Sequence, residues 1–219
     1  MINIIEHAKD INKQLIIKSK TEACYILIVD GEIETSKEII VEAGATLHVY
    51  YLFLNNTANL NISHTINQDA KIFSRSLVLS ESEIKVVTEY DFVGFASVGE
   101  VKVDAVLSGA ANLKYDAILR VKPKAQQSNT RVDMRLYLNS AAARGQLTPQ
   151  LEVAAKDVKA GHSASTFKLA KDDLFYLQSR GLSLAQIKAL QLKALSNNFV
   201  QGLDFETSKT ILDLITKHI

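Results

Sequence analysis

The chain has 219 residues, 47% of them apolar, so it can bury a sizeable core in one large domain or in one domain with a small extension. Its 25 basic and 24 acidic side chains give a net charge of +1, which excludes the positive excess typical of nucleic-acid binding. No apolar run predicts a membrane span, and the first ten residues do not resemble a secretory signal. The single cysteine, Cys24, excludes an intrachain disulfide framework and favours a reducing cytoplasm.

Residues 1–11 form a short N-terminal segment, in which Ile4, Ile5 and Ala8 share one side of a helix and so favour helical structure. Residues 12–169 are a predicted β core, because short runs rich in Ile, Val, Leu and Tyr alternate between apolar and polar side chains. The predicted strands lie at 15–17, 25–29, 39–41, 46–54, 60–66, 72–79, 84–88, 101–107, 113–121, 132–138, 147–153 and 163–169.

The regular spacing of these runs fits two architectures, an antiparallel sandwich or a β-solenoid whose coils stack in parallel. Base rates favour the sandwich slightly. Against it, the chain has few hairpin signals, and Asp30-Gly31 is the one clear example. The pattern of the residues by itself leaves both architectures open.

The predicted core ends within residues 149–181, where strand-like sequence gives way to helix-like sequence. Leu151–Val153 continues a strand after a proline, and the polar segment that follows predicts a turn at Gly161-His162. A helix is expected over 171–180, with Gly181 at the position of a left-handed C-cap.

Residues 170–219 are predicted to form a small helical region. Ser183 and Gln186 have the spacing of a capping box, and Asp204 is placed to cap a last helix. Ile187 and Leu190 are expected on one apolar face. Helices this short cannot bury an apolar stripe alone, so they must pack on each other, on the β core or on a partner.

A string of residues near this junction carries a resemblance to a known family. The string comprises Pro149, Leu151-Glu152, Asp157-Val158-Lys159, His162, Ala164, Leu174-Phe175-Tyr176-Leu177 and Ser179-Arg180-Gly181, with Phe92-Val93-Gly94 upstream. It resembles the core domain of the SufB/SufD family, the scaffold subunits of the SUF iron–sulfur cluster assembly machinery. The chain departs from the family pattern at Ser163–Phe167, where the family usually has Gly-Ala-Thr-Val-Gly. The resemblance implies a right-handed parallel β-helix core with a small C-terminal α-helical region, and this decides between the two architectures.

The resemblance also implies a role without catalysis. SufB has a functional cysteine at a position that corresponds to the neighbourhood of Ala143, and acidic residues beside its histidine where this chain has Gly161 and Ser163. The chain therefore resembles a short SufD-like member. His162 is the retained position that could ligate iron, as one ligand of an iron–sulfur cluster shared across a subunit boundary. The isolated chain is expected to hold no cluster stably, because its one cysteine is remote.

Partner binding is the second implication of the resemblance. The C-terminal helices are expected to dock a SufC-like ATPase, and the core strands to pair with a SufB-like subunit or with a second copy of the chain. No nucleic-acid or membrane partner is expected, and the location implied is the cytoplasm. The residues assigned to ATPase docking are Leu174, Phe175, Tyr176, Leu177, Arg180, Ile187 and Leu190.

A β-helix enzyme that acts on an anionic polysaccharide, as a lyase or hydrolase, is the alternative hypothesis. Arg131, Asp133 and Arg135 alternate along one predicted strand, with Arg144 beyond, and could bind an anionic sugar or merely form solvated charge pairs. No catalytic-triad, zinc-protease or phosphate-loop motif is present in the sequence. His48 and His64 are predicted to be satisfied core or surface histidines, and Cys24 a small buried side chain on a strand.

Overall fold

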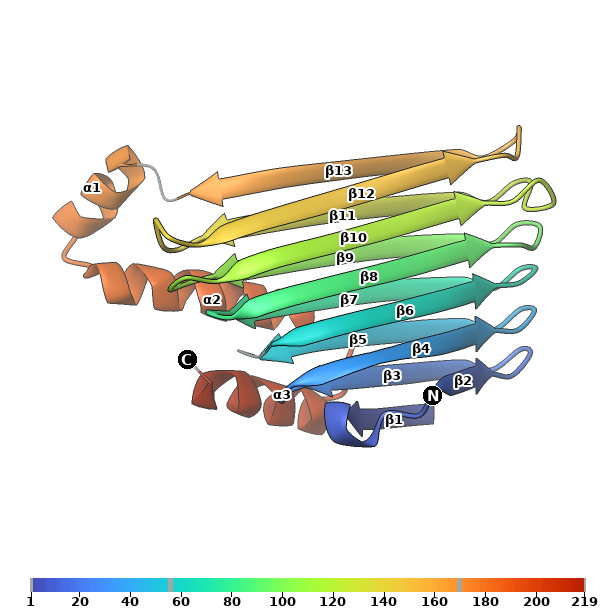
Figure 1. Ribbon diagram of the computed structural model, residues 1–219, viewed down its shortest axis with the longest axis horizontal. Coiled ribbons are helices and arrows are strands. Elements are labelled where there is room, and N and C mark those ends of the chain that lie inside the picture. Colours follow the sequence, from blue (N-terminus) through green and yellow to red (C-terminus); the bar gives the residue numbers. More distant parts are fainter. Residues whose placement is uncertain (1, 55–56, 169–170, 219) are drawn as a thin grey trace.

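The computed structural model describes residues 2–54, 57–168 and 171–218, with the backbone alone at 171–173. In these residues the strands form two all-parallel sheets that face each other (Figure 1). Sheet A contains, in spatial order, β1 (Ile2–His7), β3 (Glu22–Val29), β5 (Thr46–Leu54), β7 (Lys71–Ser80), β9 (Val98–Leu107), β11 (Asn129–Leu138) and β13 (Lys159–Lys168). Sheet B contains β12 (Arg144–Val153), β10 (Asn112–Val121), β8 (Glu83–Phe92), β6 (Ala58–Ile66), β4 (Ile33–Val41) and β2 (Gln14–Ile17).

Successive strands alternate between the two sheets, and each strand that is not at a sheet edge pairs in parallel with the strands two before and two after it. The chain is therefore wound into a parallel β-solenoid, and the architecture implied by the family resemblance is confirmed. A sandwich of hairpins is excluded for the described residues, since no two consecutive strands pair with each other.

One corner of the solenoid is built from residues in the left-handed backbone region. The N–H of Gly44 (φ 70°) donates to the Gln68 carbonyl at 2.8 Å, and the N–H of Ala96 (φ 53°) donates to the Gln126 carbonyl at 2.9 Å. Each coil thus fixes the turn of the next one. The corner residues are Lys20, Gly44, Asp69, Ala96 and Gln127, and after the last four come buried small residues, Ala45, Ala70, Ser97 and Ser128.

The space between the sheets holds an apolar core that also contains paired polar side chains. His64 is fully buried, with Nδ1 2.8 Å from the Glu89 carbonyl and Nε2 2.6 Å from the Tyr51 hydroxyl. Since a carbonyl only accepts, Nδ1 carries the proton and Nε2 accepts from the Tyr51 hydroxyl. The ring stacks on Tyr90 at a centroid distance of 4.2 Å. The prediction of a satisfied core histidine is confirmed for His64.

The N-terminal segment is a strand rather than the expected helix. Ile2–His7 pairs with β3 along its whole length, and only Ala8–Asp10 makes a helical turn, of the 3₁₀ type. A strand gains ladder hydrogen bonds from an existing sheet edge, whereas an isolated helix of this length is marginal. Glu6 then points inward and forms a buried ion pair with Lys37, at 2.9 Å between Oε2 and Nζ. Burial raises the pKa of Glu6, but hydrogen bonds from Lys37, Tyr25 and Asn12 outweigh burial and lower it below its usual value.

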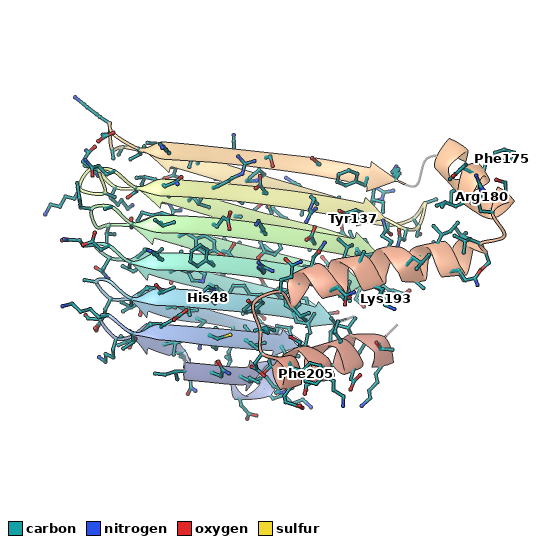
Figure 2. All side chains as sticks on the ribbon, turned by 180° about the vertical axis from the view of Figure 1, so that it is seen from behind. His48, Tyr137, Phe175, Arg180, Lys193 and Phe205 are labelled. Carbon is teal, nitrogen blue, oxygen red and sulfur yellow. The ribbon has the colours of Figure 1, made fainter. Side chains whose placement is uncertain are left out.

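The helices are α1 (Lys171–Ser179), α2 (Leu184–Phe199) and α3 (Phe205–Lys217). The capping box of Ser183 and Gln186 is confirmed, as are the Asp204 cap and the positive φ of Gly181. Helices α2 and α3 lie on the outer face of sheet A, whereas α1 projects beyond the ends of its strands (Figure 2). No helix in the described ranges is long and apolar enough to cross a membrane.

A second apolar cluster, here called the helix-covered cluster, joins α2 and α3 to the sheet. It contains Cys24, Ile26, Ile28, Tyr50, Leu52, Leu54, Leu77, Leu79 and Val106 from sheet A, with Leu195, Phe199, Val200, Ile211 and Ile215 from the helices. Two polar contacts hold the turn between α2 and α3 in place. The Tyr50 hydroxyl donates to the Gln201 carbonyl at 3.0 Å, and Arg75 Nη1 donates to the Asn198 carbonyl at 2.7 Å.

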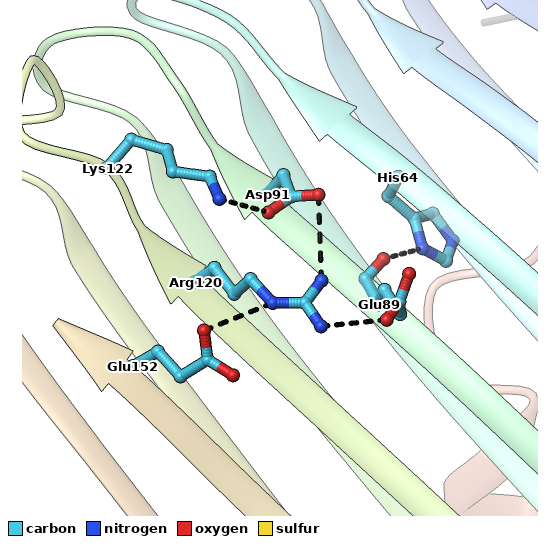
Figure 3. A network of polar contacts seen from close by, with 6 residues as sticks. All are labelled: His64, Glu89, Asp91, Arg120, Lys122 and Glu152. Carbon is cyan, nitrogen blue, oxygen red and sulfur yellow. Dashed lines mark hydrogen bonds and ion pairs between the residues drawn. The ribbon is translucent and has the colours of Figure 1, made fainter.

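The outer face of sheet B carries a network of ion pairs across three coils (Figure 3). The Arg120 guanidinium lies 2.8 Å from Glu89, 3.2 Å from Glu152 and 3.8 Å from Asp91. Asp91 also pairs with Lys122 at 3.3 Å. Three carboxylates thus surround two cations, and the network ties the last strand of sheet B to the coils before it.

The buried His64 predicts a loss of stability in mild acid. Burial lowers its pKa from 6.5 to about 4, although the hydrogen bond to the Glu89 carbonyl opposes the shift. Below pH 6.5, therefore, His64 binds a proton in the unfolded chain but stays neutral in the folded one, and the stability of the fold decreases as the pH falls towards 4. We expect protonation of His64 in the unfolded chain to lower the free energy of unfolding by about 2 kcal/mol between pH 7 and pH 5.

Urea unfolding of the wild type and of His64→Gln at both pH values measures this effect. Glutamine can still donate to the Glu89 carbonyl and accept from Tyr51, but it does not titrate. The variant should lose about 2 kcal/mol less than the wild type over this pH interval. Equal losses in the two proteins would show that His64 is not the group responsible.

Candidate functional site

The C-terminal end of the solenoid is open. Among the described strands, β13 is paired on one side only, with β11, and β12 only with β10, so both present an unpaired edge. Leu147, Leu151 and Val158 are only partly buried against the core, because no further described coil covers them. Pro149 lies within β12, where an edge strand tolerates the missing N–H. This end combines unpaired backbone groups with apolar side chains, the two features of a pairing surface.

His162 lies at this open end, inside β13 and not in the turn expected from the sequence. The turn falls earlier because Gln126, from the preceding coil, accepts hydrogen bonds through Oε1 from the N–H groups of Lys156 and Asp157 at 3.2 and 2.9 Å. His162 is in register with the buried Val132, so its imidazole points towards the interior side of sheet A. Its Nδ1 lies 3.2 Å from the Pro149 carbonyl, and the side chain is exposed.

Few other metal-ligating groups accompany His162. Cys24 is on β3, near the other end of the solenoid, and is only 3% exposed beneath the helices, as predicted for a small buried side chain. Burial, with a smaller contribution from Asp204, raises the pKa of the Cys24 thiol to about 11. Ala143 is buried at the corner between β11 and β12. In the part of the chain that the structure describes, no three His, Cys, Asp or Glu side chains are grouped so that they could hold a metal ion.

The helices present a separate apolar surface. Phe175 is 76% exposed and Tyr176 is 56% exposed, with the Arg180 guanidinium 5.3 Å from the centre of the Tyr176 ring. Leu174 and Leu177 are half-buried on the same helix. Together with Leu190, these residues form what we call the α1–α2 surface.

The two residues assigned to the apolar face of α2 are separated by the structure. Ile187 is 4% exposed and packs inward, whereas Leu190 is 54% exposed. The face that α2 buries instead runs through Ile187, Leu195 and Phe199. Ile187 is therefore a structural residue of the helix, and Leu190 remains accessible.

The charged residues of the alternative hypothesis fall in two places. Arg131 and Asp133 form a bidentate pair on β11 at 2.6 and 2.8 Å, and Arg135 binds Asp104 of β9 at 2.7 Å. Arg144 begins β12 in the other sheet and does not join them. His48 is partly exposed on the outer face of sheet A, where its Nε2 lies 3.4 Å from Glu22 and its ring stacks on Phe73, so the prediction of a satisfied core or surface histidine is confirmed.

Comparison with known proteins agrees with the fold. The family described as SUF system FeS cluster assembly, SufBD core domain, matches residues 36–195, more than half of the chain. Over 133 residues the chain is 27% identical to the iron-sulfur cluster assembly protein SufD of Bacillus subtilis. Over 105 residues it is 31% identical to the chloroplastic protein ABCI7 of Arabidopsis thaliana, and over 140 residues 20% identical to the SufBD family protein ycf24 of Porphyra purpurea.

These alignments cover 60%, 48% and 64% of the chain respectively, but only 30%, 22% and 29% of the three relatives. The chain therefore matches less than a third of the length of each of these relatives. The region matched by the family model, residues 36–195, contains the open end of the solenoid and most of α2.

Proposed function

The chain belongs to the SufBD core family, and from this membership we propose that it is a SufD-like scaffold subunit in iron–sulfur cluster assembly. The observation that carries the proposal is the open solenoid end within a matched core domain. The family is a scaffold-type family, so the proposed role needs no catalytic group on this chain. We place it in the cytoplasm, where a single reduced thiol is the ordinary state of a cysteine.

The open end is the proposed site of pairing with a SufB-like subunit or with a second copy of the chain. Exposed strand edges recruit further strands, and β12 and β13 are each ten residues long. The edge also carries the accessible His162. A partner on this end would therefore bring its own side chains next to the imidazole, which supports the assignment of His162 as one ligand of a shared cluster.

The α1–α2 surface is the proposed docking site for a SufC-like ATPase. Its large exposed side chains, Phe175, Tyr176 and Leu190, lie outside the helix-covered cluster, so they are available without unpacking the helices from the sheet. Exposed aromatics next to an arginine are typical of the residues that dominate binding energy at interfaces. Ile187 is not part of this surface.

The polysaccharide enzyme has less support. Arg144 lies in the other sheet, so it does not join Arg131 and Arg135. The aspartates beside these two arginines, Asp133 and Asp104, form ion pairs with them and so are not free to act as the acid or base of a lyase or hydrolase.

Docking of the ATPase is tested by Phe175→Asp in the full chain. A carboxylate placed in an apolar contact is costly to bury, so we expect co-purification with a SufC-type ATPase to weaken at least tenfold, on the order of a hot-spot residue. Phe205→Asp is the matched control, because Phe205 is also 76% exposed but lies at the start of α3, far from α1 (Figure 2).

Thermal melting of both variants monitors folding, and both should melt like the wild type because the two side chains are exposed. Retention of the ATPase by Phe175→Asp, or equal loss in the control, would contradict docking through the α1–α2 surface.

Cluster binding is tested by anaerobic reconstitution of the isolated chain with iron and sulfide. Iron–sulfur clusters need several thiolates, and the one thiol here is buried with a raised pKa. We expect no stoichiometric cluster after desalting, by iron and sulfide analysis and by absorption. A stable cluster that is lost in Cys24→Ala would overturn this expectation.

A further inference from the structure

A groove of about 460 Å³ lies on the outer face of sheet A, beside the C-terminal end of α2. Its floor crosses β7, β9, β11 and β13, and Asn198 and Gln201 contribute to its wall. The charged side chains that line it are Arg75, Lys102, Asp104, Arg131, Asp133 and Arg135. The sequence separates Arg75 and Lys102 from the Arg131–Arg135 segment, and the register of the coils brings them together.

The groove carries more cations than carboxylates. Four cations share two carboxylates, in a chain whose net charge is only +1. Arg131 and Arg135 each use the Nε and Nη2 edge of the guanidinium for one aspartate. Among the described residues, none accepts a hydrogen bond from Nη1 of either arginine, so this group is available to another acceptor. Arg75 donates to a neutral carbonyl, that of Asn198.

Two of these cations are direct neighbours across the strands. Arg75 on β7 is in register with Lys102 on β9. This pair is unfavourable for folding because the two positive charges repel each other. On its other side Lys102 is in register with Asp133 of β11, and its Nζ also lies 3.5 Å from Glu100, on the same strand and outside the groove lining. The Arg120 network of sheet B has the opposite balance, with three carboxylates around two cations (Figure 3).

Strand β13 contributes a glycine and two serine hydroxyl groups to this side of the groove. Gly161, Ser163 and Ser165 continue the rows of Arg131, Asp133 and Arg135 onto β13. A Cβ on Gly161 would lie 3.8 Å from Arg131 Nη1, so the glycine leaves that guanidinium edge uncovered. The Ser163 hydroxyl donates to Asp133 at 2.6 Å, and Ser165 lines the groove as well.

We propose that this groove binds a small molecule with two or more anionic groups, phosphate or carboxylate. Planar guanidinium groups bind both kinds of oxyanion in a bidentate manner. Lys102, on the strand between those of Arg75 and Arg131, supplies a further point charge. The wall formed by α2 makes the site one-sided and limits the ligand to small-molecule size. The site shares no lining residue with the α1–α2 surface, but its last strand, β13, is also an edge of the open solenoid end.

Isothermal titration of the full chain with pyrophosphate and, separately, with citrate tests the proposal. We expect saturable binding of one equivalent of at least one of these anions, and the stronger of the two identifies phosphate or carboxylate as the preferred group. Arg75→Gln combined with Lys102→Gln should weaken binding about tenfold or more, because each cation contributes a charge-assisted hydrogen bond.

The matched control is Lys114→Gln combined with Arg144→Gln. Both residues lie on sheet B, and the double change removes the same two positive charges outside the groove. Melting curves establish that both double variants are folded. Binding that survives in the control and is lost in the groove variant supports the proposal. Failure of the wild type to bind either anion, or equal weakening in the control, overturns it.

Discussion

Each coil of the solenoid depends on its neighbours for its backbone hydrogen bonds, and this dependence creates two ends. At the N-terminal end, the described strands β1 and β2 have six and four residues, and the buried Lys37–Glu6 pair lies behind them. The other end stops at two ten-residue strands with unpaired edges and partly buried leucines. Natural sheets usually protect such edges, and this is the physical basis of the pairing that we propose at β12 and β13.

The stacking of the coils also divides the outer face of sheet A into an apolar part and a charged part. Along two rows of cross-strand neighbours, apolar side chains on β3 and β5 are followed by charged ones on β9 and β11. One row runs from Ile26 and Tyr50 to Lys102 and Asp133, and the other from Ile28 and Leu52 to Asp104 and Arg135. Helices α2 and α3 cover the apolar part, and the groove occupies the charged part. Arg75 belongs to both, since it fixes the Asn198 carbonyl at the end of α2 and lines the groove. The helices can therefore expose Phe175 and Leu190 while staying attached to the core.

Much of the fold could be predicted from local patterns. The period-two runs correspond to strands β2 to β13, and the caps at Ser183 and Asp204 follow from residue types that satisfy free N–H groups. The choice between sandwich and solenoid could not be made from the pattern, because both bury alternating strands. Only the family resemblance decided it.

The errors share a cause, which is that neighbours distant in sequence decide the local structure. Gln126 sets the turn before β13, so His162 lies in a strand. The free edge of β3 recruits Ile2–His7 as a strand, where local composition suggested a helix. The register between coils also places Arg75 next to Lys102, and no local pattern in the sequence predicts this contact between strands.

The most direct test of the scaffold account is the molar mass of the 24.2 kDa chain in solution, alone and mixed with a SufB-type subunit, by sedimentation equilibrium. Ala164 is exposed on β13, and Ala164→Lys places a charge on that edge; Asn61→Lys, at an exposed position of β6 away from the open end, is the control. The account predicts a dimer or a complex for the wild type and the control, and dissociation for Ala164→Lys. A wild type that stays monomeric both alone and in the mixture would contradict it.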